Sequence, residues 1–201
     1  MQPLTEIRIA GFGGQGVILA AAIIGEAAAL FQGGYATMTQ SFGPEARGGS
    51  SSAQVILSTE PILYPYVAQP DVLVVLSQEA YTRFTPELKH GGMLLVEQDL
   101  VRMHQSPAGA RVFGVPATRL AEELGRKVVL NVVMVGFFGA VTNLLDADAL
   151  RKAVADSVPP ALQKLNLQAF DKGFTYGAQA IDRLAENAET ESVLPASLEF
   201  L

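Results

Sequence analysis

Residues 7–16 read Ile-Arg-Ile-Ala-Gly-Phe-Gly-Gly-Gln-Gly, and this stretch decides the expected fold. Ile7 and Ile9 alternate with other residues and run into Gly11, which is typical of a β-strand that stops at a tight turn. A segment rich in Ala, Ile and Leu follows from residue 16 to about residue 30, with Glu26 as its one charge. We therefore predict a strand, a glycine turn and a helix. The helix should pack on a sheet with one side and be covered on the other, with another subunit as a candidate cover.

The rest of the sequence continues as alternating strands and helices. Further strands are predicted at 35–38, 52–57, 71–76, 93–96 and 111–115, and helices from 77 to about 89, from Thr118 to Gly125, from Asp146 or Asp148 to Pro159, and from about 167 to 184. Only a short Gly- and Pro-rich loop separates the first two of these strands, so we expect them to be antiparallel. The run at 71–76 is almost entirely apolar, which predicts a central strand covered on both faces.

These elements predict an α/β fold: a Rossmann-like, mixed but mostly parallel sheet flanked by helices, with a helical C-terminal half. Residues 1–185 are predicted to form a single domain, and residues 186–201 an acidic tail that we expect to be mobile. The apolar run at 128–145 approaches membrane-spanning length, but polar residues such as Asn131 interrupt it, so we predict a buried helix. The sequence does not open on the apolar core of a signal peptide, and a cytoplasmic location is expected.

The composition favours a partner protein and excludes some kinds of chemistry. The chain has 201 residues, of which 17% are charged, below the roughly 25% of typical soluble domains. Mean hydropathy is +0.28, so we expect more apolar surface than a solitary domain needs. A net charge of −6 disfavours nucleic-acid binding, which needs a basic face. Because the sequence has no cysteine, the chain cannot form a disulfide or supply a thiolate to an iron–sulfur cluster.

Three segments are expected to meet beyond the carboxyl ends of the parallel strands, where open α/β sheets bind ligands. They are the turn after the first strand, the loop at 39–49 after the second, and the residues that follow the central strand. The turn could set backbone amides and a helix N-terminus against a phosphate, or it could be only a tight strand-to-helix connection. Its candidate cofactor-binding residues are Gly11, Gly13, Gly14, Gln15 and Gly16. An NAD site would need an acidic residue near the end of the second strand, where the sequence has Thr39-Gln40-Ser41, so a nicotinamide cofactor is not expected.

The loop at 39–49 carries a carboxylate and a guanidinium among glycines. Its candidate residues for contact with a ligand or a partner are Phe42, Gly43, Glu45, Arg47, Gly48 and Gly49. Arg47 could pair with an anion or with a carboxylate of a partner, or it could form a local ion pair with Glu45. Ser77 and Gln78, after the central strand, are further candidates for such a contact, or they could begin and cap a helix.

Neither a metal site nor a catalytic group is evident in the sequence. His90 and His104 are isolated from carboxylates at ligand spacing, so we expect no metal site. Nothing in the sequence places either histidine beside a serine that it could activate as a nucleophile. The chain therefore looks catalytically incomplete.

Taken together, these motifs resemble one protein family. Residues 11–16 (Gly-Phe-Gly-Gly-Gln-Gly), 39–49 (Thr-Gln-Ser-Phe-Gly-Pro-Glu-Ala-Arg-Gly-Gly), 70–73 (Pro-Asp-Val-Leu) and 77–81 (Ser-Gln-Glu-Ala-Tyr) resemble the gamma subunit of 2-oxoacid:ferredoxin oxidoreductases. The resemblance covers most of residues 5–180. The segment at 39–49 is similar to the 2-oxoglutarate branch, while the pyruvate and branched-chain branches share its Gly-Pro-Glu-x-Arg-Gly-Gly core.

The resemblance implies a division of labour among subunits. Enzymes of this family decarboxylate a 2-oxoacid on thiamine diphosphate, pass electrons through iron–sulfur clusters to ferredoxin, and transfer the acyl group to coenzyme A. Thiamine diphosphate and the clusters are expected in alpha and beta partner subunits, with a delta subunit as a further candidate partner. This chain is expected to bind no cofactor alone, to be inactive alone, and to pack on the catalytic subunits near the coenzyme A side.

Two other interpretations of the sequence stay open. One is a freestanding nucleotide-binding oxidoreductase, which the glycine turn favours and the missing acidic residue disfavours. The other is a purely structural or regulatory subunit whose loop contacts only protein.

Overall fold

The protein is built on one six-stranded mixed sheet, seen in a computed structural model that describes residues 4–43, 49–103 and 107–193. Its strands are β1 (Leu4–Phe12), β2 (Tyr35–Phe42), β3 (Ser50–Ser58), β4 (Val72–Val75), β5 (Met93–Glu97) and β6 (Arg111–Val115), in the order β2-β3-β1-β4-β5-β6. Strands β1, β4, β5 and β6 are parallel, whereas β3 is antiparallel to both of its neighbours, β1 and β2. The predicted α/β class, the mostly parallel sheet and the antiparallel pair β2–β3 are confirmed.

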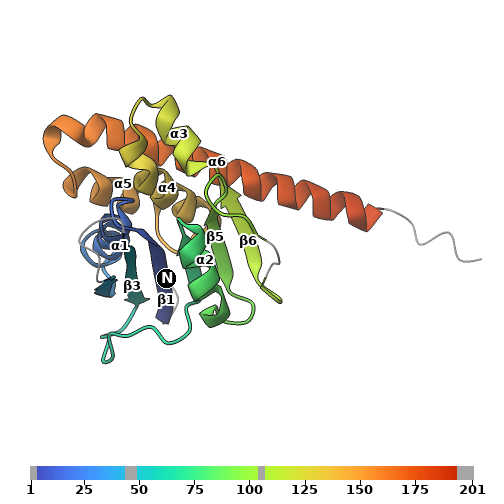
Figure 1. Cartoon of the computed structure of the whole chain (residues 1–201), viewed down its shortest axis with the longest axis horizontal. Helices are drawn as coiled ribbons and strands as arrows, with labels where there is room; N and C mark the ends of the chain where they lie inside the picture. The colour runs from blue at the N-terminus through green and yellow to red at the C-terminus, as the bar shows by residue number, and fades with distance from the viewer. Residues whose placement is uncertain (1–3, 44–48, 104–106, 194–201) are drawn as a thin grey trace, which may run out of the picture.

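Helices cover both faces of this sheet (Figure 1). They are α1 (Val17–Glu26) with its π-helical continuation η1 (Ala27–Phe31), α2 (Gln78–Phe84) with the short η2 (Thr85–Glu87), α3 (Ala117–Glu123), η3 (Lys127–Val129), α4 (Leu130–Thr142), α5 (Ala147–Asp156) and α6 (Pro160–Val193). Side chains of α1 and α4 share the larger core with Ile7 and Ile9 of β1, while α2 packs on the opposite face with Ala10 and Leu73. The helix after the glycine turn is thus covered by the sheet on one side and by α4 and α5 on the other.

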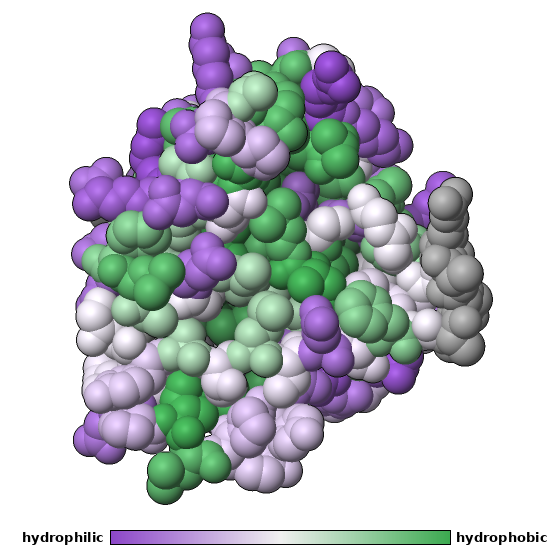
Figure 2. All heavy atoms as spheres, turned by 90° about the vertical axis from the view of Figure 1, so that its left-hand side faces the viewer, coloured by the Kyte–Doolittle hydropathy of each residue, from purple (hydrophilic) through white to green (hydrophobic). Residues whose placement is uncertain are grey.

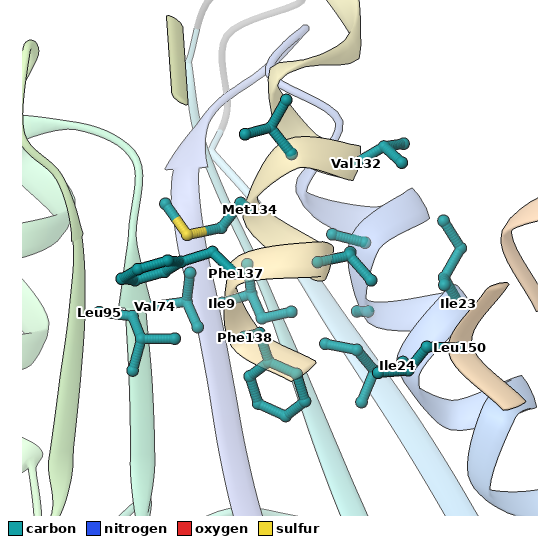
Figure 3. Packing of buried hydrophobic residues seen from close by; sticks show 14 of the residues in the cluster. Ile9, Ile23, Ile24, Val74, Leu95, Val132, Met134, Phe137, Phe138 and Leu150 are labelled. Carbon is teal, nitrogen blue, oxygen red and sulfur yellow. The ribbon is translucent and has the colours of Figure 1, made fainter. Parts of the chain in front are cut away.

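Helix α4 is the centre of the larger core. Phe137, Phe138 and Met134 of α4 pack toward Ile9, Val74 and Leu95 of three parallel strands (Figure 3). The predicted buried helix within 128–145 is therefore confirmed. Among the residues that the structure describes, no helix is long and apolar enough to cross a membrane.

Helix α6 lies directly against α4 because glycines remove the side chains between them. A Cβ atom on Gly136 would fall on the carbonyl oxygen of Phe170, and one on Gly173 would fall on the carbonyl oxygen of Val133. The two backbones therefore approach more closely than any larger residue would allow. This contact fastens the C-terminal helix, which extends well past the sheet, to the body of the domain (Figure 1).

The predicted boundaries of three elements are wrong. Strand β2 continues to Phe42, so residues 39–42 are strand rather than loop; β2 is an edge strand with an exposed face, and its Thr-Gln-Ser composition lacks the apolar alternation that marks a strand. Thr118 does not cap α3, because the helix begins one residue earlier, after Pro116. The last helix begins at Pro160 rather than near 167, since proline is well suited to a first helical turn, and it continues past 184 to Val193.

Candidate functional site

The candidate site lies where the chain changes direction in the sheet. After β1 the chain crosses through α1 to β2 on one side, and after β4 it crosses through α2 to β5 on the other. Strands β1 and β4 are adjacent and parallel, and the connections that follow them lead to opposite sides of the sheet. A crevice therefore lies between these connections, at the carboxyl ends of the two strands. Open α/β sheets bind ligands in such crevices. The structure thus brings together two of the predicted segments, the glycine turn and the residues that begin with Ser77.

Gln15 holds the two sides of the crevice together. Its Oε1 atom accepts a hydrogen bond from the Phe12 amide at 2.6 Å, and its Nε2 atom donates to the Leu76 carbonyl at 2.8 Å. Both ends of the side-chain amide are therefore engaged by the backbone at the ends of β1 and β4. Gln15 therefore shapes the crevice, and its amide keeps one further acceptor position and one further N–H that a ligand could use.

The glycines of the turn are required for different reasons. A Cβ atom on Gly11 would lie 2.9 Å from Cβ of Leu76, and one on Gly16 would overlap the side chain of Asn131, so these two positions serve close packing. A Cβ atom on Gly14 would meet nothing within 4 Å, but this residue has a φ of +94°, which a residue with a side chain rarely adopts. At Gly14 the backbone itself therefore faces open space, while Gly16, which is closely packed, also has a positive φ of +73°.

The β2–β3 hairpin adjoins the turn. The Gly13 amide donates to the Gly49 carbonyl at 2.8 Å, and the Gly43 amide donates to the Ser50 carbonyl at 2.7 Å, which closes the base of the hairpin. Phe42, the last residue of β2, is 64% exposed. Glu45, Arg47 and Gly48 lie outside the described residues, so their contacts remain predictions.

Ser77 is the cap of α2. Its Oγ atom accepts a hydrogen bond from the Ala80 amide at 3.2 Å, as expected for an N-cap serine. Gln78 accepts a hydrogen bond from the Arg102 amide at 2.8 Å through Oε1. Both residues thus have structural roles, and both also line the crevice.

The crevice contains a cavity of about 450 Å³. Apolar residues form most of its wall, together with the turn, the start of α2 and one cation. The lining residues are Phe12, Gly14, Gln15, Leu76, Ser77, Gln78, Leu100, Lys127, Val128 and Leu130. An apolar wall with one positive group suits an organic molecule that carries an anionic substituent.

Part of the cavity wall was not predicted from the sequence: it is formed by Leu100, Lys127, Val128 and Leu130. Lys127 lies in η3, just before α4, and its side chain is 60% exposed with Nζ 3.8 Å from Oε1 of Glu122. No local pattern indicates that this lysine lines the same cavity as the glycine turn, because their proximity depends on how α4 packs against α1. The available signal was the basic pair Arg126-Lys127 directly before an apolar run.

A buried carboxylate supports the same edge of the sheet. Glu97, the last residue of β5, is fully buried and accepts hydrogen bonds from the amides of Leu100 at 2.7 Å and Thr118 at 3.0 Å. It therefore joins the turn after β5 to the first turn of α3 and takes the capping role that we predicted for Thr118. Burial raises the pKa of the Glu97 carboxyl above its ordinary value of 4.5, although the two amide hydrogen bonds act in the opposite direction.

The raised pKa predicts a pH-dependent difference between the wild type and Glu97→Gln. The pKa of Glu97 is higher in the folded protein than in the unfolded protein, so ionising this carboxyl costs stability. The cost is absent at pH values below the pKa in the unfolded protein and fully present above the pKa in the folded protein. The free energy of unfolding of the wild type, minus that of the variant, should therefore fall as the pH rises from about 4.5, the ordinary value, through the folded pKa. Urea unfolding between pH 4 and 8 measures this difference, in which other titrating groups cancel. A difference that grows with pH would mean that the two amide hydrogen bonds outweigh burial.

The histidines do not form a metal site in the part of the chain that the structure describes. No group of three or more His, Cys, Asp or Glu side chains there is placed to hold a metal ion. His90 is exposed, and His104 lies outside the described residues.

Comparison with known proteins agrees with this architecture. The 2-oxoglutarate synthase subunit KorC of Methanocaldococcus jannaschii is 47% identical over 171 residues, which cover 84% of this chain and 91% of that subunit. The gamma subunit of the keto/oxoacid ferredoxin oxidoreductase from Geobacter sulfurreducens is 41% identical, with a TM-score of 0.77 over 88% of this chain and 99% of that one.

A longer protein carries the same fold as one part of its chain. The 2-oxoglutarate:ferredoxin oxidoreductase from Magnetococcus marinus, solved with 2-oxoglutarate, coenzyme A and succinyl-CoA bound, aligns with a TM-score of 0.79 and 25% identity. The alignment covers 90% of this chain but 32% of that one. Pyruvate ferredoxin/flavodoxin oxidoreductase is the family whose sequence pattern matches residues 6–176. The chain therefore belongs to the pyruvate ferredoxin/flavodoxin oxidoreductase family.

Proposed function

We propose that this chain is the gamma subunit of a 2-oxoglutarate:ferredoxin oxidoreductase, which oxidatively decarboxylates 2-oxoglutarate to succinyl-CoA. The observation that carries the proposal is the 47% identity to a KorC subunit over 91% of its length. Alpha and beta subunits, and a delta subunit where the complex has one, would supply thiamine diphosphate, the iron–sulfur clusters and the route to ferredoxin. The absence of cysteine from this chain fits that division, because the clusters need thiolates from elsewhere.

Within the complex, the cavity between β1 and β4 is our candidate for contact with coenzyme A. The structure of the Magnetococcus marinus relative was solved with coenzyme A bound. In this chain the apolar wall could hold the uncharged parts of coenzyme A, while Lys127 could attract one of its phosphates. At Gly14, which has a φ of +94° and no atom within 4 Å of a Cβ position, there is room for a close approach of the ligand. Arg47 is a second candidate, for a phosphate or for a carboxylate of a catalytic subunit.

Lys127→Ala is expected to raise the KM for coenzyme A in the assembled enzyme by about three- to tenfold, with a smaller effect on kcat. The loss is modest because the Lys127 side chain is 60% exposed and solvent screens the charge. Steady-state kinetics at varied coenzyme A concentration measures it. Lys164→Ala, at an exposed position of α6, is the control and should leave this KM unchanged. Equal KM values for the two variants would show that Lys127 does not contribute to coenzyme A binding.

The substrate assignment can be tested with the copurified complex and three 2-oxoacids. We expect kcat/KM to be highest for 2-oxoglutarate and lower for pyruvate and 2-oxoisovalerate. A complex that prefers pyruvate would keep the subunit assignment but place the chain in another branch of the family.

A further inference from the structure

The loop between β3 and β4 presents an apolar tip to solvent. Leu63 is 95% exposed, Tyr64 is 67% exposed and Tyr66 is 56% exposed. The rings of the two tyrosines contact each other edge to face, with centroids 5.5 Å apart. Large apolar side chains at such exposure cost free energy in water unless another surface covers them.

The base of this loop is fastened to the sheet. The Val67 amide donates to Oε1 of Gln54 at 2.9 Å, and Nη2 of Arg8 lies 3.4 Å from the Val67 carbonyl. Arg8 is itself buried, forms an ion pair with Glu87 and stacks on Phe84 with 4.7 Å to the ring centroid. The exposed tip therefore projects from an anchored base.

Two prolines restrict the tip further. Pro61 and Pro65 fix their own φ angles and restrict the residues before them. The segment from residue 60 to residue 65 therefore has few conformations. A segment of this kind loses little conformational entropy when it binds. Exposed tyrosines on a restricted loop have the composition and the pre-organisation of a binding hot spot.

The loop and the cavity lie at opposite ends of the strands. Ser58, the residue before the loop, pairs with Leu4 at the start of β1, whereas the glycine turn follows the end of β1. Leu4 and Tyr35, which flank Ser58 in the sheet register, are also about half exposed. The loop projects below the sheet in Figure 1, and Figure 2 shows apolar side chains protruding at the lower edge of the molecule.

We propose that residues 61–66 dock into an apolar recess of a catalytic subunit of the oxidoreductase, an inference that rests on the proposed function. In the Magnetococcus marinus relative the matching part is 32% of a longer chain, so the backbone connects it to other parts of that protein. This chain matches 91% of a KorC relative that is a separate subunit, and because this chain has no cysteine for a disulfide, non-covalent contacts would hold it in a complex. Glu60 is the only charged residue between Ser58 and Asp71, which favours a recess with a basic group at its rim.

The test is the variant L63S/Y64S/Y66S, titrated against the complex of partner subunits purified without this chain. Its affinity should fall by at least about tenfold, as for loss of hot-spot residues. The control Leu184→Ser removes an exposed leucine of α6 and should bind like the wild type. When the triple variant is added at saturating concentration, the complex should show the wild-type KM for coenzyme A, because the loop and the cavity lie at opposite ends of the strands.

Each other outcome overturns a stated part of the proposal. Wild-type affinity of the triple variant, with circular dichroism showing it folded, would overturn docking through this loop and leave the proposed function intact. If light scattering shows that the isolated wild-type chain is a dimer and the triple variant a monomer, the occupant is a second copy of this chain. Failure of the wild-type chain itself to bind the partner subunits would overturn both this proposal and the proposed function.

Discussion

Gly173→Ala should lower the free energy of unfolding by at least about 3 kcal/mol, at the upper end of the usual cost of overpacking a core. The added methyl group would fall on the carbonyl oxygen of Val133 in α4, and a second contact would be made with the backbone amide of Phe137 at 3.1 Å. These atoms are backbone in a buried helix, so they cannot move aside as a flexible side chain could. Helix α6 would have to separate from α4, which would expose part of the larger core.

The matched control for this prediction is Gly25→Ala in α1. There the added methyl group would meet Cβ of Ala36 at 3.8 Å and Cγ1 of Val55 at 3.9 Å, which are ordinary contacts. Because alanine favours a helix over glycine by about 1 kcal/mol, this variant should be as stable as the wild type or slightly more stable. Urea unfolding followed by circular dichroism compares the three proteins. Equal stability of the Gly173 and Gly25 variants would show that α4 and α6 are not in the close contact described here.

The fold was largely predictable because its strongest signals are local. An alternating strand that runs into Gly11, and an apolar run at 71–76, give the two central parallel strands without any knowledge of the partners. The short connection between β2 and β3 was enough to predict an antiparallel pair. The length of β2 was not predictable, since an edge strand with a solvated face can be polar on both sides.

The candidate site was predictable only in part. Glycine turns and the residues after central strands can be placed at the carboxyl edge of a sheet by a general rule. The partners that close the site come from far along the chain: Lys127 lines the cavity, and the side chain of Asn131 fills the space beside Gly16. Glu97 shows the same limit, because it accepts the Thr118 amide across 21 positions of sequence and so replaces a local cap. Such contacts depend on tertiary packing, which sequence periodicity does not contain.

The second large effect concerns activity, and it follows from the division of labour among subunits. This chain has no cysteine with which it could ligate an iron–sulfur cluster. We therefore expect the isolated chain to oxidise no 2-oxoacid. The catalytic subunits should need it for coenzyme A-dependent turnover, because part of the proposed coenzyme A contact lies in its cavity.

Turnover of 2-oxoglutarate with coenzyme A and ferredoxin is the measurement that tests the proposed function most directly, with the partner subunits assayed alone, this chain alone, and all of them together. We predict coenzyme A-dependent reduction of ferredoxin only in the full mixture. We also predict that Lys164→Ala restores this activity as well as the wild-type chain does. Coenzyme A-dependent turnover by this chain alone, or undiminished turnover by the partner subunits without it, would contradict the proposed function.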